Sequence, residues 1–143
     1  WELRACDYYE EFEKPKIVWP DLCESPEFAF DDKNHYVVNT AYVMPCVDLS
    51  LLCVLNSPLV EFWYRHASAQ VRGGYLRFIR SYILSIPIPE FSLHPSLREL
   101  GLRLAFHGGD LSWEEESHVG VYKSYGLSPK EISLIERECK MRQ

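Results

Sequence analysis

The sequence predicts an α+β fold, in which a small, mostly antiparallel sheet packs with helices and a helical extension follows at the C-terminus. Three observations lead to this prediction. Short β-branched and aromatic segments, bounded by Pro and Asp residues, occupy the first third of the chain. Apolar residues recur at helical spacing in the middle, and two helix-start patterns follow near the end. A chain of 143 residues can bury a core of ordinary size.

The first third predicts a short helix followed by three strands. Residues 7–13 look like the end of a helix, which Pro15 closes. The aromatic and β-branched stretches at 16–19, 27–30 and 35–44 predict strands. The polar residues Asp31-Asp-Lys-Asn34 are typical of a hairpin turn, so the strand at 35–44 is expected to pair with the strand at 27–30.

The middle of the chain predicts a broken helix and then an extended segment. Apolar residues from 51 to 63 follow helical spacing after Asp48, a plausible N-cap, and Pro58 is expected to kink or split this helix. Gly73 and Gly74 interrupt the chain. Residues 75–86 then alternate loosely between apolar and polar, which favours a strand that ends at Pro87.

The last third predicts three helices. The first covers 95–106, the second begins at a Ser112 cap with Glu115 three residues later, and the third begins with Ser128-Pro-Lys-Glu131 after the C′ glycine Gly126. We therefore expect residues 1–109 to form one domain and residues 110–143 to form a helical extension packed on it.

Charge is distributed unevenly along the chain. The net charge is −6, yet residues 62–106 hold six arginines against two acids, whereas residues 1–61 hold twelve acids against four bases. A basic stretch is the requirement for phosphate contact. The five cysteines show no zinc or disulfide spacing, and the apolar runs are too short to span a membrane. We expect a soluble, cytoplasmic protein.

Two catalytic motifs, one of a methyltransferase and one of a nuclease, can be compared with the sequence. Adenine-N6 methyl transfer needs a Pro-Pro-aromatic motif that stacks on a flipped base, and the nearest match, Asn56-Ser-Pro-Leu59, lacks it. Pro20-Asp21 followed by Asp31-Asp-Lys33 fits a loose restriction-nuclease spacing, in which two carboxylates hold Mg²⁺ and the lysine supports the attacking water. A Mg²⁺-dependent nuclease using Asp21, Asp31 and Lys33 is therefore an alternative function.

The run from 70 to 80 is the strongest candidate for a contact with nucleic acid. Its two glycines allow the backbone to approach another surface closely. The arginines around them match phosphate oxygens or the O6/N7 edge of guanine, with aromatic neighbours beside them. From this chemistry alone, an equally good interpretation is a glycine turn whose arginines pair with the acidic first third. The residues that form the run are Arg72, Gly73, Gly74, Tyr75, Arg77, Phe78 and Arg80.

Several ordered motifs together resemble the TaqI-like C-terminal specificity domain. They are residues 7–21, Asn39-Thr40, residues 55–57, residues 72–78 and residues 86–89, followed by a helical tail at 125–132. The resemblance implies a non-catalytic DNA target-recognition domain of a bacterial restriction-modification enzyme. Its expected partners are double-stranded DNA and an N-terminal adenine-N6 methyltransferase domain of the same polypeptide. That domain would bind S-adenosylmethionine, with Mg²⁺ required if a nuclease is fused in a type IIG enzyme.

The resemblance places the DNA-facing loop at residues 72–78. Lys14, Lys16 and Trp19 belong to a second matching motif, in which the two lysines are candidate DNA contacts and a structural role is the alternative. Asn39 and Thr40 are further candidate contacts. The overall acidity departs from what a DNA-binding module needs, so the methyltransferase domain is expected to supply much of the phosphate binding. A further alternative makes the acidic face and the C-terminal helices a docking surface for another subunit.

Overall fold

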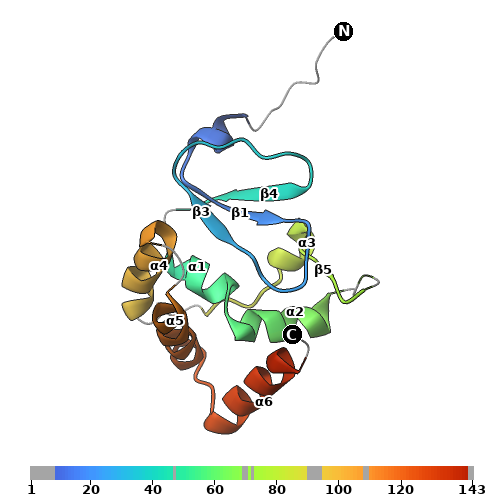
Figure 1. Ribbon diagram of the computed structural model, residues 1–143, viewed down its shortest axis with the longest axis vertical. Helices are drawn as coiled ribbons and strands as arrows, with labels where there is room; N and C mark the ends of the chain where they lie inside the picture. The colour runs from blue at the N-terminus through green and yellow to red at the C-terminus, as the bar shows by residue number, and fades with distance from the viewer. Residues whose placement is uncertain are drawn as a thin grey trace.

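The computed structural model describes residues 9–46, 48–68, 71, 73–89, 95–107 and 110–141. A three-stranded antiparallel sheet lies against helices α1 and α2. Helices α4 and α5 lie on the left of Figure 1, and α6 lies at the bottom. This mixture of small antiparallel sheets and helices is the α+β class predicted from the sequence. The elements are a 3₁₀ helix η1 (Tyr9–Glu13), β1 (Lys16–Pro20), β2 (Leu22–Cys23), β3 (Ala29–Asp31), β4 (Ala41–Pro45), α1 (Ser50–Leu55), α2 (Pro58–Ala67), β5 (Leu76–Arg77), α3 (Arg80–Ile83), α4 (Ser96–His107), α5 (Leu111–Ser124) and α6 (Pro129–Lys140).

Strand β1 lies in the middle of the larger sheet, whose order is β3-β1-β4. Lys16 lies opposite Asp31 on β3, and Trp19 lies opposite Tyr42 on β4. The expected pairing between the second and third predicted strands was wrong, because both pair with β1 instead. Ile17 and Trp19 on β1 are buried, as befits a central strand with neighbours on both edges.

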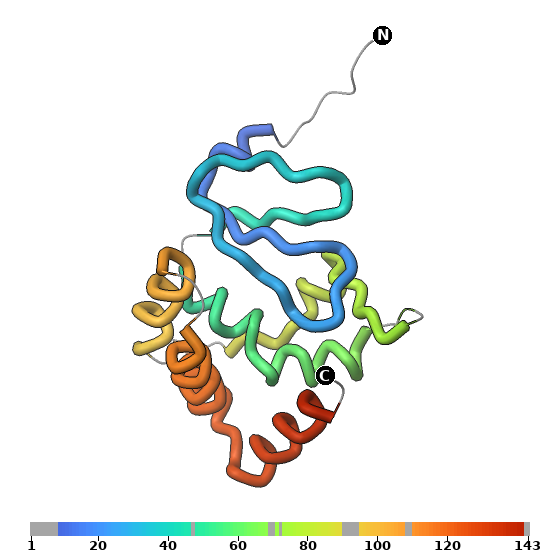
Figure 2. Tube along the Cα trace, in the orientation of Figure 1, coloured from blue at the N-terminus to red at the C-terminus, as the bar shows by residue number. Residues whose placement is uncertain are grey.

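The segment after β3 explains the different topology. The Asp31 carboxylate accepts hydrogen bonds from the backbone N–H groups of Lys33 and His35, both at 3.0 Å. This local turn directs the chain away from β3, and residues 32–40 form the wide loop at the top of Figure 2. The next strand begins only at Ala41, so no tight hairpin joins β3 to β4.

The core is continuous between the sheets and the helices. It includes Trp19 on β1, Phe28 just before β3, Tyr64 from α2, Phe78 after β5 and Val121 from α5. The Tyr64 and Phe78 rings stack with centroids 4.3 Å apart. The aromatic side chains therefore fix the position of the segment that contains the two glycines.

Helix boundaries follow their capping residues. The predicted break at Pro58 is confirmed: α1 ends at Leu55, and α2 begins at Pro58 with Ser57 as its N-cap. The capping box of Ser128 and Glu131 at the start of α6 is also confirmed. By contrast, α5 is capped by Asp110 rather than Ser112. No helix in the described part of the chain is long and apolar enough to cross a membrane.

The strand predicted over 75–86 is mostly wrong. Within this range only Leu76 and Arg77 form a strand, and the chain then forms the short helix α3. Burial explains this, because Ile83 and Ile86 both face the core; they are three positions apart, a spacing that suits a helical turn and that strict alternation would place on opposite faces.

Helices α5 and α6 pack on the rest of the molecule. Helix α5 contacts α1 and α4, and α6 contacts α2. The Tyr125 hydroxyl at the end of α5 donates to the Pro87 carbonyl at 2.8 Å. The expected division at residue 109 remains a prediction.

Candidate nucleic-acid interface

A tight turn precedes β5 and contains the two predicted glycines. Gly73 and Gly74 have φ of 96° and 88°, a region that side chains with a Cβ rarely adopt. The Val71 N–H donates to the Tyr75 carbonyl at 2.9 Å and closes the turn. Tyr75 is 41% exposed, so this turn presents its backbone and one aromatic ring to solvent. Arg72 lies outside the described residues.

The backbone after this turn is held by long-range hydrogen bonds. The Tyr64 hydroxyl donates to the Arg77 carbonyl at 2.8 Å, and Trp19 Nε1 donates to the Phe78 carbonyl at 2.8 Å. The Phe78 N–H donates to the Asp21 carbonyl at 2.7 Å. Because α2 and β1 both supply donors, the backbone that follows the glycine turn is anchored to two separate elements.

Side chains alternate along β5. Leu76 and Phe78 are completely buried, so Phe78 cannot contact DNA as expected from the sequence and instead packs in the core. Arg77 points to solvent with a side chain 56% exposed, and its Nε and Nη2 each lie 3.4 Å from a different oxygen of Asp21. Arg80, the first residue of α3, is exposed. Arg77 and Arg80 are therefore both accessible to a ligand.

The Asn39-Thr40 segment lies close to the same place. It forms an exposed turn before β4, rather than lying within a strand as expected. The Thr40 carbonyl accepts a hydrogen bond from the Asp21 N–H at 2.9 Å. Asp21 thus links the turn at 39–40 with Arg77, and all three lie where β1 ends, beside β5 on the right of Figure 1.

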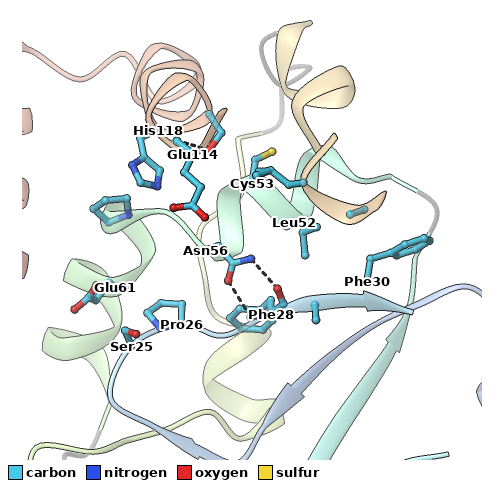
Figure 3. Close-up of a pocket in the computed structure, with 15 residues that line it drawn as sticks. Ser25, Pro26, Phe28, Phe30, Leu52, Cys53, Asn56, Glu61, Glu114 and His118 are labelled. Atoms are coloured by element: carbon cyan, nitrogen blue, oxygen red, sulfur yellow. Dashed lines mark hydrogen bonds between the residues drawn. The ribbon is translucent and has the colours of Figure 1, made fainter. Parts of the chain in front are cut away.

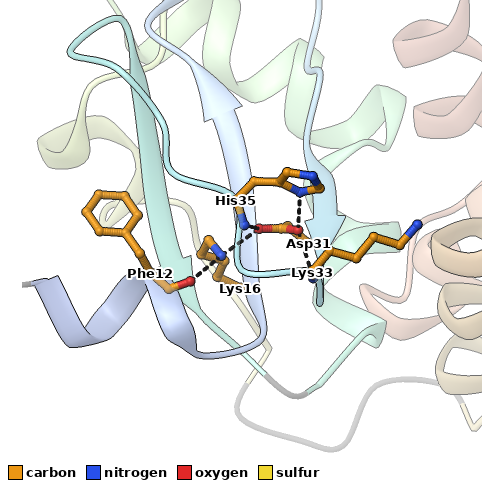
Figure 4. A network of polar contacts seen from close by, with 5 residues as sticks. All are labelled: Phe12, Lys16, Asp31, Lys33 and His35. Carbon is orange, nitrogen blue, oxygen red and sulfur yellow. Dashed lines mark hydrogen bonds and ion pairs between the residues drawn. The ribbon is translucent and has the colours of Figure 1, made fainter.

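The predicted lysine contacts lie at the other end of β1. Lys14 is exposed and pairs with Glu11 on η1 at 2.6 Å. Lys16 has no exposed surface: its Nζ lies 2.5 Å from Asp31 Oδ2 and donates to the Phe12 carbonyl at 2.7 Å (Figure 4). A DNA contact through Lys16 is incompatible with this burial. Its role is to join η1, β1 and β3.

Asp31 is the acceptor at the centre of this network. Burial alone would raise the pKa of its carboxyl, but hydrogen bonds from Lys16, His35 and two backbone N–H groups hold that pKa well below its usual range. His35 Nδ1 lies 2.8 Å from Asp31 Oδ1. The carboxylate therefore stays ionised in the folded protein well into acid.

The lowered pKa of Asp31 predicts a pH dependence of stability. Its contribution is fully present above the unfolded-state pKa, about 3.9, and is lost as the pH falls below that value. In urea unfolding between pH 7 and pH 3, Asp31→Asn should be less stable than the wild type at pH 7. That difference should narrow below about pH 4, and a constant difference would contradict the network.

The nuclease residues are not brought together. Asp21 follows the end of β1, whereas Asp31 lies opposite Lys16 at its beginning. The five residue steps from Lys16 to Asp21 span roughly 16 Å along the strand, whereas two ligands of one Mg²⁺ each lie about 2 Å from it. The Lys33 side chain also points away from Asp31 (Figure 4). Among the described residues, no group of three or more His, Cys, Asp or Glu side chains is placed to hold a metal ion.

A separate cavity of about 530 Å³ lies between the β3 region and helices α1, α2, α4 and α5. Asn56 stands beside it, where its side-chain amide donates to the Phe28 carbonyl at 2.8 Å and accepts from the Phe28 N–H at 2.9 Å (Figure 3). Asn56 is therefore committed to the backbone, as expected for a helix break. Glu114 and His118 enter this cavity from α5, away from the glycine turn.

Sequence reasoning missed the importance of Asp21, Tyr64 and Trp19 at the glycine turn. From the sequence, Asp21 is a candidate metal ligand and the last residue of the matching stretch 7–21, whereas Tyr64 directly follows the apolar positions 51–63 and is not singled out. Their hydrogen bonds to residues 77 and 78 span 56, 13 and 59 positions. The acidic first third of the chain could have indicated the contact between Asp21 and Arg77, since one interpretation of the sequence pairs its carboxylates with the arginines of the 70–80 run.

Comparison with known proteins shows which family this chain belongs to. The chain is 26% identical over 124 residues to the type II methyltransferase M.XhoI of Xanthomonas vasicola and 27% identical over 125 residues to the type II methyltransferase M.PaeR7I of Pseudomonas aeruginosa. Each alignment covers 85% of this chain but only 22% and 21% of the relatives, so the chain spans about a fifth of their length. Residues 2–88 match the TaqI-like C-terminal specificity domain, and the chain therefore belongs to this family.

Proposed function

We propose that this chain is the DNA target-recognition domain of a restriction-modification methyltransferase. The observation that carries the proposal is the pair of exposed arginines, Arg77 and Arg80, beside a rigidly anchored glycine turn in a member of a specificity-domain family. Arginine forks recognise phosphate and guanine edges, and a backbone without Cβ atoms can approach a duplex closely.

The finer parts of the proposal concern the rest of the enzyme. We infer that the catalytic domain is an adenine-N6 methyltransferase that precedes this domain in the same polypeptide and binds S-adenosylmethionine. The names of the two relatives, both type II methyltransferases, support a methyltransferase, and their much greater length is consistent with a further domain. In that arrangement this chain supplies specificity and the other domain supplies the reaction. Detection of N6-methyladenine in duplex treated with the intact enzyme and S-adenosylmethionine would test the proposed chemistry.

The test of DNA recognition is the replacement of the exposed arginines in the intact enzyme. Arg77→Ala and Arg80→Ala should each weaken binding to the recognition duplex by about 1–3 kcal/mol, which is roughly 5- to 150-fold. Equilibrium titration measures this change. Arg98→Ala is the matched control, because Arg98 is exposed on α4, a helix remote from the glycine turn, and should leave the affinity unchanged.

The salt dependence of binding separates recognition from subunit docking. Phosphate contacts make the affinity fall steeply as salt increases, so the wild type should show a steep slope, and a variant that loses a phosphate contact should show a shallower one. Unchanged affinity and unchanged site choice in both variants, together with a flat response to salt, would favour docking and overturn the proposal.

A further inference from the structure

We propose that Arg77 recognises a guanine in the target sequence and that Asp21 is the positioning residue that orients its guanidinium. This inference rests on the proposed function and specifies which arginine reads a base. It begins from the contact between the two side chains, where Arg77 Nε faces Asp21 Oδ1 and Nη2 faces Oδ2, both at 3.4 Å.

The contact uses only one edge of the guanidinium. A guanidinium carries five N–H donors in a plane, and Asp21 engages those on the Nε/Nη2 edge. On the other edge, Nη1 and Nη2 each have one N–H group that Asp21 does not engage, and these two N–H groups point in nearly parallel directions. That arrangement matches the O6 and N7 acceptors of guanine in the major groove.

The backbone holds both residues in a fixed relation. Arg77 lies opposite Leu22 in the β2–β5 ladder, next in sequence to Asp21. The Asp21 carbonyl accepts a hydrogen bond from the Phe78 N–H at 2.7 Å, and the Asp21 N–H donates to the Thr40 carbonyl. Since these bonds use main-chain atoms, a change of the Asp21 side chain leaves the anchoring intact. The carboxylate orients a side chain that is otherwise exposed to solvent.

Charge favours a base over a phosphate as the ligand of this arginine. The Asp21 carboxylate is partly buried, with a side chain 21% exposed, and its negative charge offsets that of Arg77. A phosphate approaching the pair meets a carboxylate as well as a cation, which weakens attraction that depends on charge alone. The Asp21 charge weakens directional hydrogen bonds from Arg77 to a neutral base edge much less than it weakens the attraction to a phosphate. The pair should therefore contribute to discrimination more than to overall affinity.

The experiment uses the intact methyltransferase and its recognition duplex, in which each guanine in turn is replaced by 7-deazaguanine, which lacks the N7 acceptor. With wild-type enzyme, one replacement should weaken binding about tenfold through Arg77. For Arg77→Ala, that same replacement should have no further effect, while penalties at other guanines persist. Arg77→Lys should restore discrimination only in part, because an ammonium lacks the planar fork that Asp21 orients.

Asp21→Asn and Asp21→Ala test the positioning role. Each should reduce the preference for the recognition duplex over an unrelated duplex by about five- to tenfold, with affinity for the unrelated duplex unchanged or increased. Asp32→Asn is the matched control, since it removes the same charge from the exposed loop after β3, and it should leave the preference unchanged. Urea unfolding should show that the Asp21 variants remain folded.

The outcomes separate the inference from the proposed function. If Arg77→Ala weakens both duplexes equally and every 7-deazaguanine penalty persists, Arg77 contacts phosphate and the inference is overturned, although the domain still binds DNA. If the Asp21 variants keep the wild-type preference, the positioning role is overturned. If neither Arg77→Ala nor Arg80→Ala alters binding to any duplex, the proposed function fails as well.

Discussion

Replacing Lys16 with methionine is expected to lower the free energy of unfolding by about 3–5 kcal/mol. Lys16 is fully buried and pairs with Asp31 at 2.5 Å. Methionine keeps most of the volume but leaves the Asp31 carboxylate buried without its main partner. It also removes the donor to the Phe12 carbonyl. Urea unfolding at pH 7 measures the loss.

Two further variants make the Lys16 result interpretable. Lys14→Met changes an exposed lysine that pairs at the surface with Glu11 and should alter stability little. The double variant Lys16→Met/Asp31→Leu removes both charges and should recover much of the loss, because the cost arises from the unpaired carboxylate. A Lys16→Met protein as stable as the wild type would show that this ion pair does not hold the sheet.

Phe78→Ala should also be severely destabilising, by about 3–5 kcal/mol. Phe78 is completely buried and stacks on Tyr64 at 4.3 Å, so truncation leaves a cavity that the aromatic neighbours cannot fill. Thermal or urea unfolding measures the effect. Tyr75→Ala is the control for stability, because Tyr75 is substantially exposed and its loss should change the unfolding free energy little.

The same position separates packing from recognition. Phe78→Leu keeps an apolar side chain in the core and should retain wild-type affinity for DNA under conditions where it is folded. A large loss of affinity in a folded Phe78→Leu protein would mean that the ring itself takes part in DNA contact, against its complete burial.

Local features were predictable from the sequence because their causes are local. The break at Pro58 and the capping box at Ser128 depend on residues within one turn of each other. Strand β1 was also predicted, since its aromatic and β-branched residues favour extended structure. The sheet order was not, because it depends on how Asp31 turns the chain after β3.

The candidate site was predicted in part for the same reason. The glycines with their neighbouring arginines form one continuous segment, and the sequence identified it. Lys16 was a candidate DNA contact because it lies in a motif of the family resemblance, and its buried partner lies 15 positions away on another strand. Asp21 and Arg77 are separated by 56 positions, so no local pattern could show that one orients the other.

The hydrogen bonds that fix residues 77 and 78 end on main-chain carbonyls, supplied by Tyr64 and Trp19. A carbonyl is the same in every amino acid, so this support does not depend on which side chain stands at position 77. The scaffold can therefore accept a different outward-facing residue there without losing its shape. The side chains at positions 77 and 21 can therefore be replaced together while the backbone that carries them stays in place. This is the arrangement needed to retarget a specificity domain one base at a time.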